Sequence, residues 1–143
     1  MPASPSPREV VERLLEAVTG GRPADATALY AEDAHVTHPF RPGDRPLIGR
    51  ARLAEHFAAG AGLQRELEAR DVLIHATGDP EVVIAEFAYH GRVPATGRAF
   101  VVPCVFVMRV RDGLIVESRD YGHHLAMAHA LDRVPELVAA LEA

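Results

Sequence analysis

The 143-residue sequence has one cysteine, no tryptophan, no lysine and no long hydrophobic run. Cys104 has no second cysteine to pair with inside the chain, which is typical of proteins from a reducing cytoplasm. The N-terminal segment lacks the apolar core of a secretory signal peptide, and no apolar stretch approaches the ~20 residues of a transmembrane helix. These absences predict a cytoplasmic protein without a membrane segment.

Positive charge is also scarce, because 15 arginines stand against 20 acidic residues and the net charge is −5. Proteins that bind nucleic acid usually carry a basic stripe, so this class is not favoured. A cation set made only of arginine, with abundant Ala, Val, Pro and Gly, favours a GC-rich bacterial genome. The length and the apolar content of 48% predict one domain over residues 1–143, with the Pro/Ser-rich residues 1–6 disordered.

The order of periodic segments predicts the fold class. Helical spacing recurs over residues 10–18, 24–32, 50–60 and 125–143. An opening strand runs through residues 35–40, and four further β-like segments lie between 66 and 124, separated by Gly, Asp and Pro turns. We therefore expect an α+β domain: N-terminal helices packed in a strongly curved antiparallel sheet, forming a cone with an apolar cavity, plus a C-terminal helix.

Strand alternation indicates which side chains line this cavity. Along residues 98–111 one parity is wholly apolar, and it is the predicted inner wall. On the last strand, the parity that holds Tyr121 and His123 is predicted to face inward. The predicted ligand-contacting residues, from helices and strands, are Leu14, Val36, Phe40, Leu53, Phe57, Val102, Cys104, Phe106 and Met108.

The segment AEDAHVTHPF, residues 31–40, holds the strongest candidate for chemistry. Pro39 holds the backbone of His38 extended, and strand parity turns the imidazole inward together with Val36. An imidazole titrates near about 6.5, which suits general acid–base catalysis at neutral pH. The alternative interpretation is a hydrogen-bonded histidine at the end of a strand.

The segments ALYAEDAHVTHPF, PLIGRARLAEHF, AYHGR and RVRDGLIVESRDYGHHLA resemble the SnoaL-like, ketosteroid-isomerase-like branch of the nuclear-transport-factor-2-like superfamily, over roughly residues 8–131. The resemblance implies the cone-shaped fold and places His38 where isomerases have a catalytic aspartate. It also implies a homodimer through the outer sheet face, where Val101, Val105 and Val107 are apolar. The fold hosts isomerases, polyketide cyclases, epoxide hydrolases and proteins without enzymatic activity, so it does not decide the function.

Departures from the family pattern reduce the number of functions that are expected. The oxyanion tyrosine of the isomerases would fall at Leu14, and their protonated aspartate near Phe106 or Val105, so both donors are absent. Loss of one such donor typically lowers the rate ~10²–10³-fold, and a standard ketosteroid isomerase is therefore not expected. The resemblance to polyketide cyclases implies an acid/base aspartate at the position of His123, beside Gly122.

Three hypotheses follow. The first is a cofactor-free isomerase or cyclase for a hydrophobic, polyketide-type secondary metabolite, with His38, His123 and Tyr121 as catalytic residues. The second is a non-catalytic binding protein for such a molecule, which the missing oxyanion donors favour. The third is an epoxide-hydrolase-like enzyme, which needs an Asp-Arg-Asp constellation that the predicted inward positions lack. No metal is expected, because His35 and His38 point to opposite faces of a strand.

Overall fold

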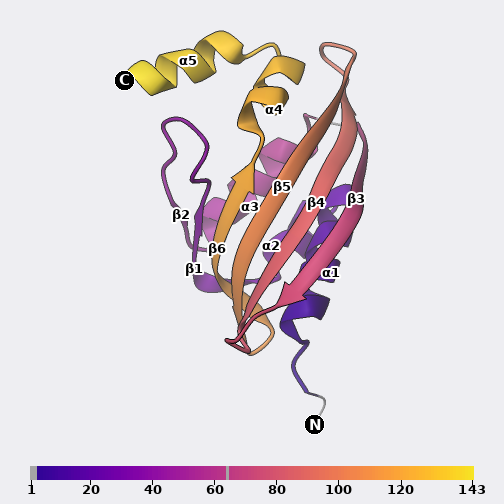
Figure 1. Ribbon diagram of the computed structural model, residues 1–143, viewed down its shortest axis with the longest axis vertical. Helices are drawn as coiled ribbons and strands as arrows, with labels where there is room; N and C mark the ends of the chain where they lie inside the picture. The colour runs from indigo at the N-terminus through magenta and orange to yellow at the C-terminus, as the bar shows by residue number, and fades with distance from the viewer. Residues whose placement is uncertain (1–2, 64) are drawn as a thin grey trace.

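The computed structural model describes residues 3–63 and 65–143. Its first half contains α1 (Pro7–Thr19), α2 (Pro23–Thr27), β1 (Tyr30–Thr37), β2 (Leu47–Ile48) and α3 (Arg50–Ala61). The long strands that follow are β3 (Arg65–Ala76), β4 (Val82–Val93), β5 (Arg98–Arg111) and β6 (Leu114–Gly122). Two helices, α4 (His124–Ala130) and α5 (Val134–Glu142), come last, within the C-terminal stretch that was predicted to be helical (Figure 1).

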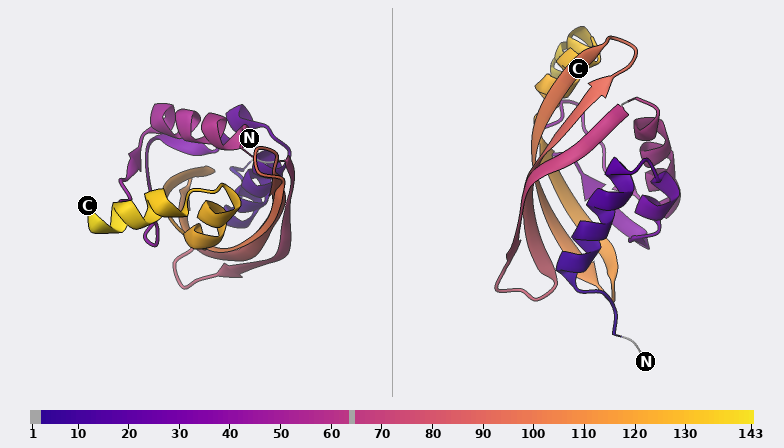
Figure 2. Two further views of the ribbon diagram at one scale, coloured as in Figure 1. Left: turned by 90° about the horizontal axis from the view of Figure 1, so that it is seen from above. Right: turned by 90° about the vertical axis from the view of Figure 1, so that its right-hand side faces the viewer.

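One six-stranded sheet in the order β2-β1-β6-β5-β4-β3 curves around the first three helices (Figures 1 and 2). The strands β3 to β6 pair antiparallel, as predicted. The pair β1–β6 is parallel, which corrects the expectation of a wholly antiparallel sheet. The predicted α+β class is confirmed, and the right-hand view of Figure 2 shows α1 and α3 on the concave side of the sheet.

Local chemistry accounts for the start of α1 and the end of α2. The Ser6 hydroxyl accepts a hydrogen bond from the backbone N–H of Glu9 at 3.2 Å and caps α1. The side chains that α1 buries are Val10, Val11, Leu14, Leu15 and Ala17. The predicted helix over residues 24–32 is shorter, because the Leu29 carbonyl accepts a hydrogen bond from Ile115 and Tyr30 already begins β1.

A β-bulge interrupts the pairing of β5 with β6. Arg109 pairs with Glu117, but the next residue of β5, Val110, pairs with Ile115. Val116 is therefore an extra residue on β6. Because side chains alternate along a strand, one extra residue exchanges the inner and outer faces beyond it.

The bulge reverses the predicted facing of β6. Ile115 is buried on the inner face before the bulge, and Ser118 and Asp120 are buried on that face after it. Tyr121 pairs with Val105 of the outer parity of β5, and His123 is exposed. The expectation that Tyr121 and His123 face inward is thus corrected. The bulge shifts the alternation by one residue, so residues beyond it with the same parity as Ile115 face outward.

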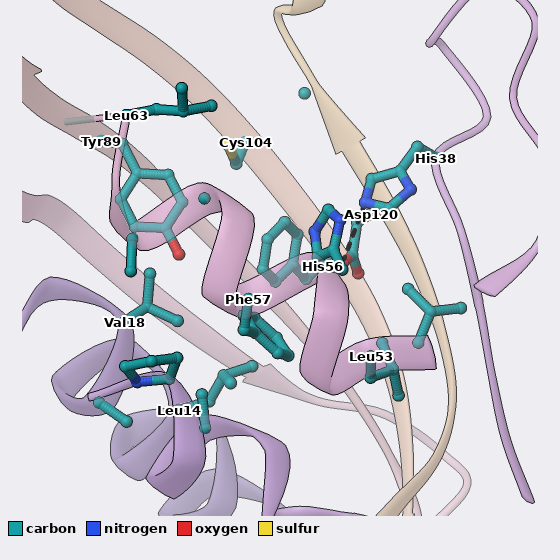
Figure 3. Close-up of a pocket in the computed structure, with 18 of the residues that line it drawn as sticks. Leu14, Val18, His38, Leu53, His56, Phe57, Leu63, Tyr89, Cys104 and Asp120 are labelled. Atoms are coloured by element: carbon teal, nitrogen blue, oxygen red, sulfur yellow. Dashed lines mark ion pairs between the residues drawn. The ribbon is translucent and has the colours of Figure 1, made fainter. Parts of the chain in front are cut away.

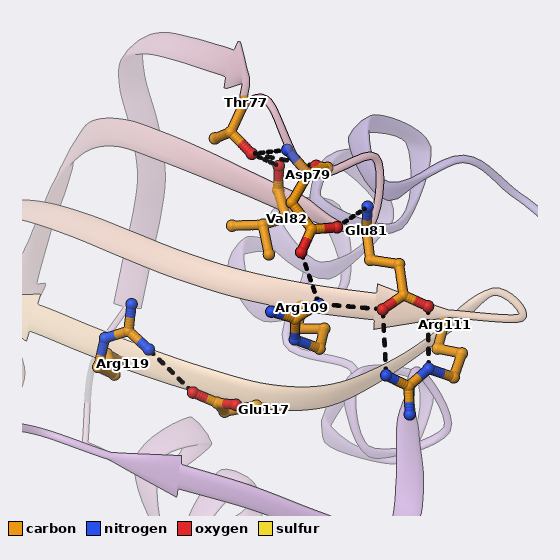
Figure 4. A network of polar contacts seen from close by, with 8 residues as sticks. All are labelled: Thr77, Asp79, Glu81, Val82, Arg109, Arg111, Glu117 and Arg119. Atoms are coloured by element: carbon orange, nitrogen blue, oxygen red, sulfur yellow. Dashed lines mark hydrogen bonds and ion pairs between the residues drawn. The ribbon is translucent and has the colours of Figure 1, made fainter.

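An exposed polar network joins the β3–β4 turn to the end of β5 (Figure 4). Arg109 donates to Asp79 at 2.9 Å and to Glu81 at 3.0 Å, and Arg111 donates two hydrogen bonds to Glu81 at 2.9 and 3.1 Å. This network fixes the turns at the end of the sheet where β6 begins.

The prediction that residues 1–6 are disordered falls partly outside the residues that the structure describes. Residues 1 and 2 lie outside the described residues, and residues 3–6 form no helix or strand although Ser6 caps α1. Within residues 3–63 and 65–143, no helix is long and apolar enough to cross a membrane.

Candidate active site

An apolar cavity of about 290 Å³ lies between the concave face of the sheet and the helices (Figure 3). The predicted ligand-contacting residues in its wall are Leu14, Val36, Leu53, Phe57, Val102, Cys104 and Phe106. The wall also contains apolar residues that the sequence did not single out, including Val18, Leu63, Met127 and Leu131. The cavity therefore offers a ligand mainly hydrocarbon surface.

The structure places two predicted ligand contacts elsewhere. Met108 is fully buried in the core and does not reach the cavity. Phe40 is 69% exposed, and its ring packs edge-on against Tyr121 at a centroid distance of 4.9 Å. Because β1 ends at Thr37 and Pro39 begins a turn, strand alternation does not extend to Phe40.

Two of the three predicted catalytic residues also lie outside the cavity. Tyr121 packs against Phe40 and does not line the cavity. His123 caps α4, where its Nδ1 accepts a hydrogen bond from the backbone N–H of Ala126 at 3.1 Å. The structure therefore does not bring His123 together with His38.

His38 does line the cavity, and Asp120 faces it across one end (Figure 3). His38 Nε2 lies 3.9 Å from Asp120 Oδ2, and both side chains are 11% exposed. The hydroxyl of Ser118 donates to the other carboxyl oxygen, Oδ1, of Asp120. His56 from α3 and His124 from α4 complete this polar end, with ring centroids 5.4 and 6.0 Å from that of His38.

Burial raises the pKa of Asp120 to about 7, and the charge of Asp44 contributes in the same direction. The hydrogen bond from Ser118 opposes this shift but does not cancel it. A carboxyl group with such a pKa exchanges a proton readily at neutral pH.

Burial lowers the pKa of His38 to about 4, and the neighbouring His56 adds to the shift. The charge of Asp44 opposes it, whereas Arg41 and His124 lower the pKa further. Between about pH 4 and 7, His38 is therefore a neutral base and Asp120 a neutral acid, and both face the same end of the cavity.

The loop between β1 and β2 contributes a second carboxylate beside His38. The backbone N–H of His38 donates to Asp44 Oδ2 at 2.8 Å, and Asp44 Oδ1 lies 3.5 Å from His38 Nδ1. The side chain of Asp44 is only 15% exposed. His38 thus stands between the carboxyl groups of Asp44 and Asp120.

Three further polar groups of the wall, two tyrosine hydroxyls and one thiol, stay neutral. Burial raises the pKa of both tyrosine hydroxyls, Tyr30 and Tyr89, and raises that of the Cys104 thiol to about 12. Cys104 therefore acts as part of the apolar wall rather than as a nucleophile. In the described part of the chain, no group of three or more His, Cys, Asp or Glu side chains could hold a metal ion.

Sequence reasoning missed Asp120, Asp44 and His56. His56 carries a usable signal, because it follows Leu53 by three residues on the same face of a helix. Asp120 was assigned to the outer face because the bulge at Val116 leaves no local mark in the sequence. Asp44 lies in a loop, where neither periodicity indicates a direction.

The family assignment agrees with this architecture. A family model described as the SnoaL-like domain matches residues 11–118. The chain belongs to the SnoaL-like family. A steroid Δ-isomerase from Nocardioides simplex is 35% identical to this SnoaL-like chain over 118 residues, which cover 80% of the chain and 87% of the relative.

Solved structures share the fold of this SnoaL-like chain. A Bacillus subtilis protein, described provisionally as an isomerase, aligns with a TM-score of 0.82 at 25% identity and covers 88% of this chain and 92% of its own. A Pseudomonas putida KT2440 protein, described provisionally as a polyketide cyclase, aligns with a TM-score of 0.77 at 20% identity, covering 89% and 98%. The second likeness shows the fold alone.

Proposed function

We propose that this SnoaL-like protein is a cofactor-free isomerase or cyclase that moves protons within a hydrophobic carbonyl compound of polyketide type. One observation carries the proposal: His38 and Asp120 face each other, buried, at the polar end of an otherwise apolar cavity. Their shifted pKa values leave one group ready to accept a proton and the other ready to donate one.

The first step forms an enol. His38 Nε2 takes a proton from the carbon next to the carbonyl group, and the Asp120 carboxyl gives its proton to the carbonyl oxygen. The electron pair of the broken C–H bond forms the C=C bond of the enol. An imidazolium and a carboxylate are left in the site, so the net charge of the pair does not change.

The second step restores both groups. In an isomerisation, the imidazolium of His38 returns its proton to a different carbon of the conjugated enol, while Asp120 recovers the proton of the enol oxygen. In a ring closure, the enol carbon attacks a second carbonyl of the same molecule, Asp120 recovers the proton of the enol oxygen as the first carbonyl re-forms, and the imidazolium protonates the new alkoxide. Neither route needs a redox partner or a leaving group.

The position of Asp120 supports this proposal despite the absence of the isomerase donors. The family resemblance puts the protonated aspartate of isomerases near Phe106, and Phe106 pairs directly with Asp120 on the neighbouring strand. A neutral carboxyl group therefore stands one strand away from the position where the family pattern has it. Full proton donation to the carbonyl oxygen also avoids a free oxyanion, which reduces the need for the donor missing at Leu14.

The lining supports a neutral, hydrophobic substrate. Burial of ~200 Å² of apolar ligand surface in the cavity contributes roughly 5 kcal/mol before the costs of association. A charged ligand would lose its hydration here and gain few partners. The steroid Δ-isomerase that is 35% identical to this chain supports a proton transfer within an apolar ketone.

A proton-exchange assay tests the proposal before the natural substrate is known. A panel of steroid enones, polyene ketones and linear diketones is incubated with the protein in D2O, and loss of the α-proton signals is followed by NMR. We expect exchange above the protein-free rate for at least one ligand that binds, and loss of this exchange in Asp120→Asn and His38→Phe. Exchange that is unchanged in both variants would refute the assignment of the pair.

The second candidate is a binding protein without chemistry, and the apolar residues Leu14 and Phe106 at the donor positions favour it. In the same assay, its signature is tight binding of an apolar ketone with no exchange above the protein-free rate. An epoxide hydrolase has less support, because Arg22, which lines the cavity, is paired with Asp25 and not with Asp120.

We also propose that the protein is a cytoplasmic homodimer that associates through the convex face of the sheet. The outward side chain of Val101 is 50% exposed, and Leu73 and Phe40 add further exposed apolar surface. The buried, unpaired thiol of Cys104 suits a reducing compartment. Light scattering at micromolar concentration tests the dimer: a monomeric mass would refute it, and Val101→Glu should shift a dimer toward monomer.

A further inference from the structure

His38 has a carboxyl group beside each of its two ring nitrogens. Nε2 faces Asp120, which belongs to the cavity, and Nδ1 faces Asp44, which belongs to the loop after β1. The proposed reaction uses Nε2 alone, so it gives Asp44 no part. The contacts of Asp44 with His38 nevertheless bear on which ring nitrogen carries the proton.

The atoms Nδ1 of His38 and Oδ1 of Asp44 are both buried, and neither has a hydrogen-bond partner elsewhere among residues 3–63 and 65–143. They lie 3.5 Å apart, a few tenths of an ångström beyond a normal N–H···O bond of about 2.7–3.2 Å. Buried polar atoms that lack a partner are costly, and a hydrogen bond between Nδ1 and Oδ1 would satisfy both atoms. Catalytic hydrogen bonds are often long in unliganded proteins and shorten when a ligand binds, so the 3.5 Å separation is compatible with a hydrogen bond in the liganded protein.

Hydrogen bonds hold the other carboxyl oxygen and the backbone of Asp44 in place. Its second oxygen, Oδ2, accepts the backbone N–H of His38 at 2.8 Å. Its backbone N–H donates to the carbonyl of Arg41 at 3.1 Å, and the N–H of Arg41 donates to the carbonyl of His38 at 2.9 Å. Two successive turns therefore fold the loop back, so that the carboxylate meets the same histidine twice.

We propose that Asp44 is a positioning residue that keeps His38 in the tautomer protonated on Nδ1, so that the lone pair of Nε2 faces Asp120. A carboxylate only accepts hydrogen bonds, so it favours a proton on the nitrogen beside it. This inference rests on the proposed function for its purpose. With the opposite tautomer, Nε2 would already carry a proton and could take none from a substrate.

Other charged and titratable groups also surround His38. They are Arg41 from the same loop, His56 from α3, His124 from α4 and Asp120 from β6. Arg41, His56 and His124 disfavour the imidazolium, whereas the charge of Asp44 favours it. Asp44 therefore also stabilises the charged ring that forms midway through the proposed reaction, as a carboxylate does behind other catalytic histidines.

The substitution Asp44→Asn separates this role from simple packing. The amide oxygen can still accept the N–H of His38, but the amide nitrogen then faces Nδ1 and donates to it. This arrangement moves the proton of the ring to Nε2. The ¹⁵N chemical shifts of the imidazole, recorded near pH 5.5 on histidine-labelled protein and assigned with His38→Phe, report the tautomer without any substrate.

We expect Nδ1–H in the wild-type protein and Nε2–H in Asp44→Asn. An Nε2–H tautomer in the wild type overturns the inference, and this outcome does not require that the variant folds. The same tautomer in both proteins also overturns it. Because the NMR result needs no turnover, it stands or falls separately from the proposed reaction.

Activity gives a second readout. For a ketone that exchanges, Asp44→Asn should lower the exchange rate on the order of 10–100-fold while binding of the ligand stays within about twofold. The matched control is Asp33→Asn, which removes an exposed carboxylate of β1 outside the cavity and should leave both the tautomer and the exchange rate unchanged. An Asp44→Asn protein with the wild-type exchange rate would contradict the positioning role.

Discussion

Carboxyl groups near the two ends of β6 behave in opposite ways. Close to its start, Asp79 and Glu81 lie in the exposed network of Figure 4. A hydrogen bond from the Glu81 backbone, followed by one from Arg109, lowers the pKa of Asp79, and hydrogen bonds from Arg111 and Arg109 lower that of Glu81. Close to the end of β6, burial raises the pKa of Asp120 to about 7.

The difference lies in the supply of donors and of water, not in the residue type. Each exposed carboxylate has water and at least one guanidinium group, so its charged form is favoured and it holds a turn in place. Asp120 has one hydroxyl donor, from Ser118, and an apolar cavity, so its neutral form is favoured. Only the second environment leaves a proton that can be moved at neutral pH.

Replacing the two kinds of carboxyl group should therefore have unequal effects on turnover, and this is the largest effect that we predict. Asp120→Asn keeps the size of the side chain but removes the transferable proton, and general acid–base catalysis is typically worth 10²–10⁴-fold. We expect the exchange or turnover rate to fall by that factor, with the circular dichroism spectrum unchanged. Asp79→Asn is the control and should keep the wild-type rate.

The pH dependence of the rate sharpens the same comparison. The proposed reaction needs a protonated Asp120 and a neutral His38, with pKa values of about 7 and about 4. The rate constant for the free enzyme should therefore be bell-shaped and fall above about pH 7 and below about pH 4. A rate that keeps rising from pH 6 to pH 9 would mean that ionised Asp120 is the base instead.

The same shift predicts how stability changes with pH. The pKa of Asp120 is raised in the folded state, so its contribution is fully present below the unfolded pKa of about 3.8 and is lost as the pH rises through about 7. Relative to wild type, Asp120→Asn should therefore gain stability between pH 4 and 7, on the order of 3–4 kcal/mol. Urea unfolding at several pH values measures this difference, and a difference that is constant with pH would contradict the shift.

The contrast between the two regions also bears on what could be predicted from the sequence. The inner wall of β5 was predicted correctly, because its alternation from Phe100 to Val110 is uninterrupted and one parity is wholly apolar. The facing of β6 was not, because the bulge at Val116 arises from its pairing with β5, which local sequence does not determine. Plain alternation therefore points to Tyr121 and His123, whereas the structure turns Asp120 into the cavity.

His38 was found because Pro39 and the family pattern both mark it within its own segment. Asp44 could not be found in that way, since two turns bring it back onto His38 and no periodicity describes a loop. The apolar part of this site is thus encoded locally along strands and helices. The acid–base part depends on a bulge and a loop, which only the three-dimensional structure shows.

A smaller effect is expected from filling the cavity beside the polar end. Gly122 lines the cavity, and a Cβ added there would lie 3.6 Å from the sulfur of Cys104 and 3.8 Å from Nε2 of His124, which are ordinary contacts. Gly122→Ala should therefore fold normally but take space from a ligand. We expect calorimetry to show roughly tenfold weaker binding for the largest ketones and no change for small ones; equal weakening of all ligands would instead indicate a damaged site.

The smallest effect is expected at the exposed network. Arg109→Ala removes the hydrogen bonds to Asp79 and Glu81, but exposed ion pairs in water contribute little because solvent and salt screen them. We expect the melting temperature at pH 7 to fall by no more than a few degrees, and the fall to shrink in 1 M NaCl.

The pKa values of both carboxyl groups are lowered in the folded state, so the contribution of the network is present at neutral pH and is lost as the pH falls through those lowered values. Arg109→Ala and wild type should therefore converge in melting temperature in strongly acidic buffer, while their exchange rates at neutral pH stay equal. A large loss of activity in Arg109→Ala would show that the two regions are coupled through β6, and the separation between a structural and a reactive set of carboxyl groups would then fail.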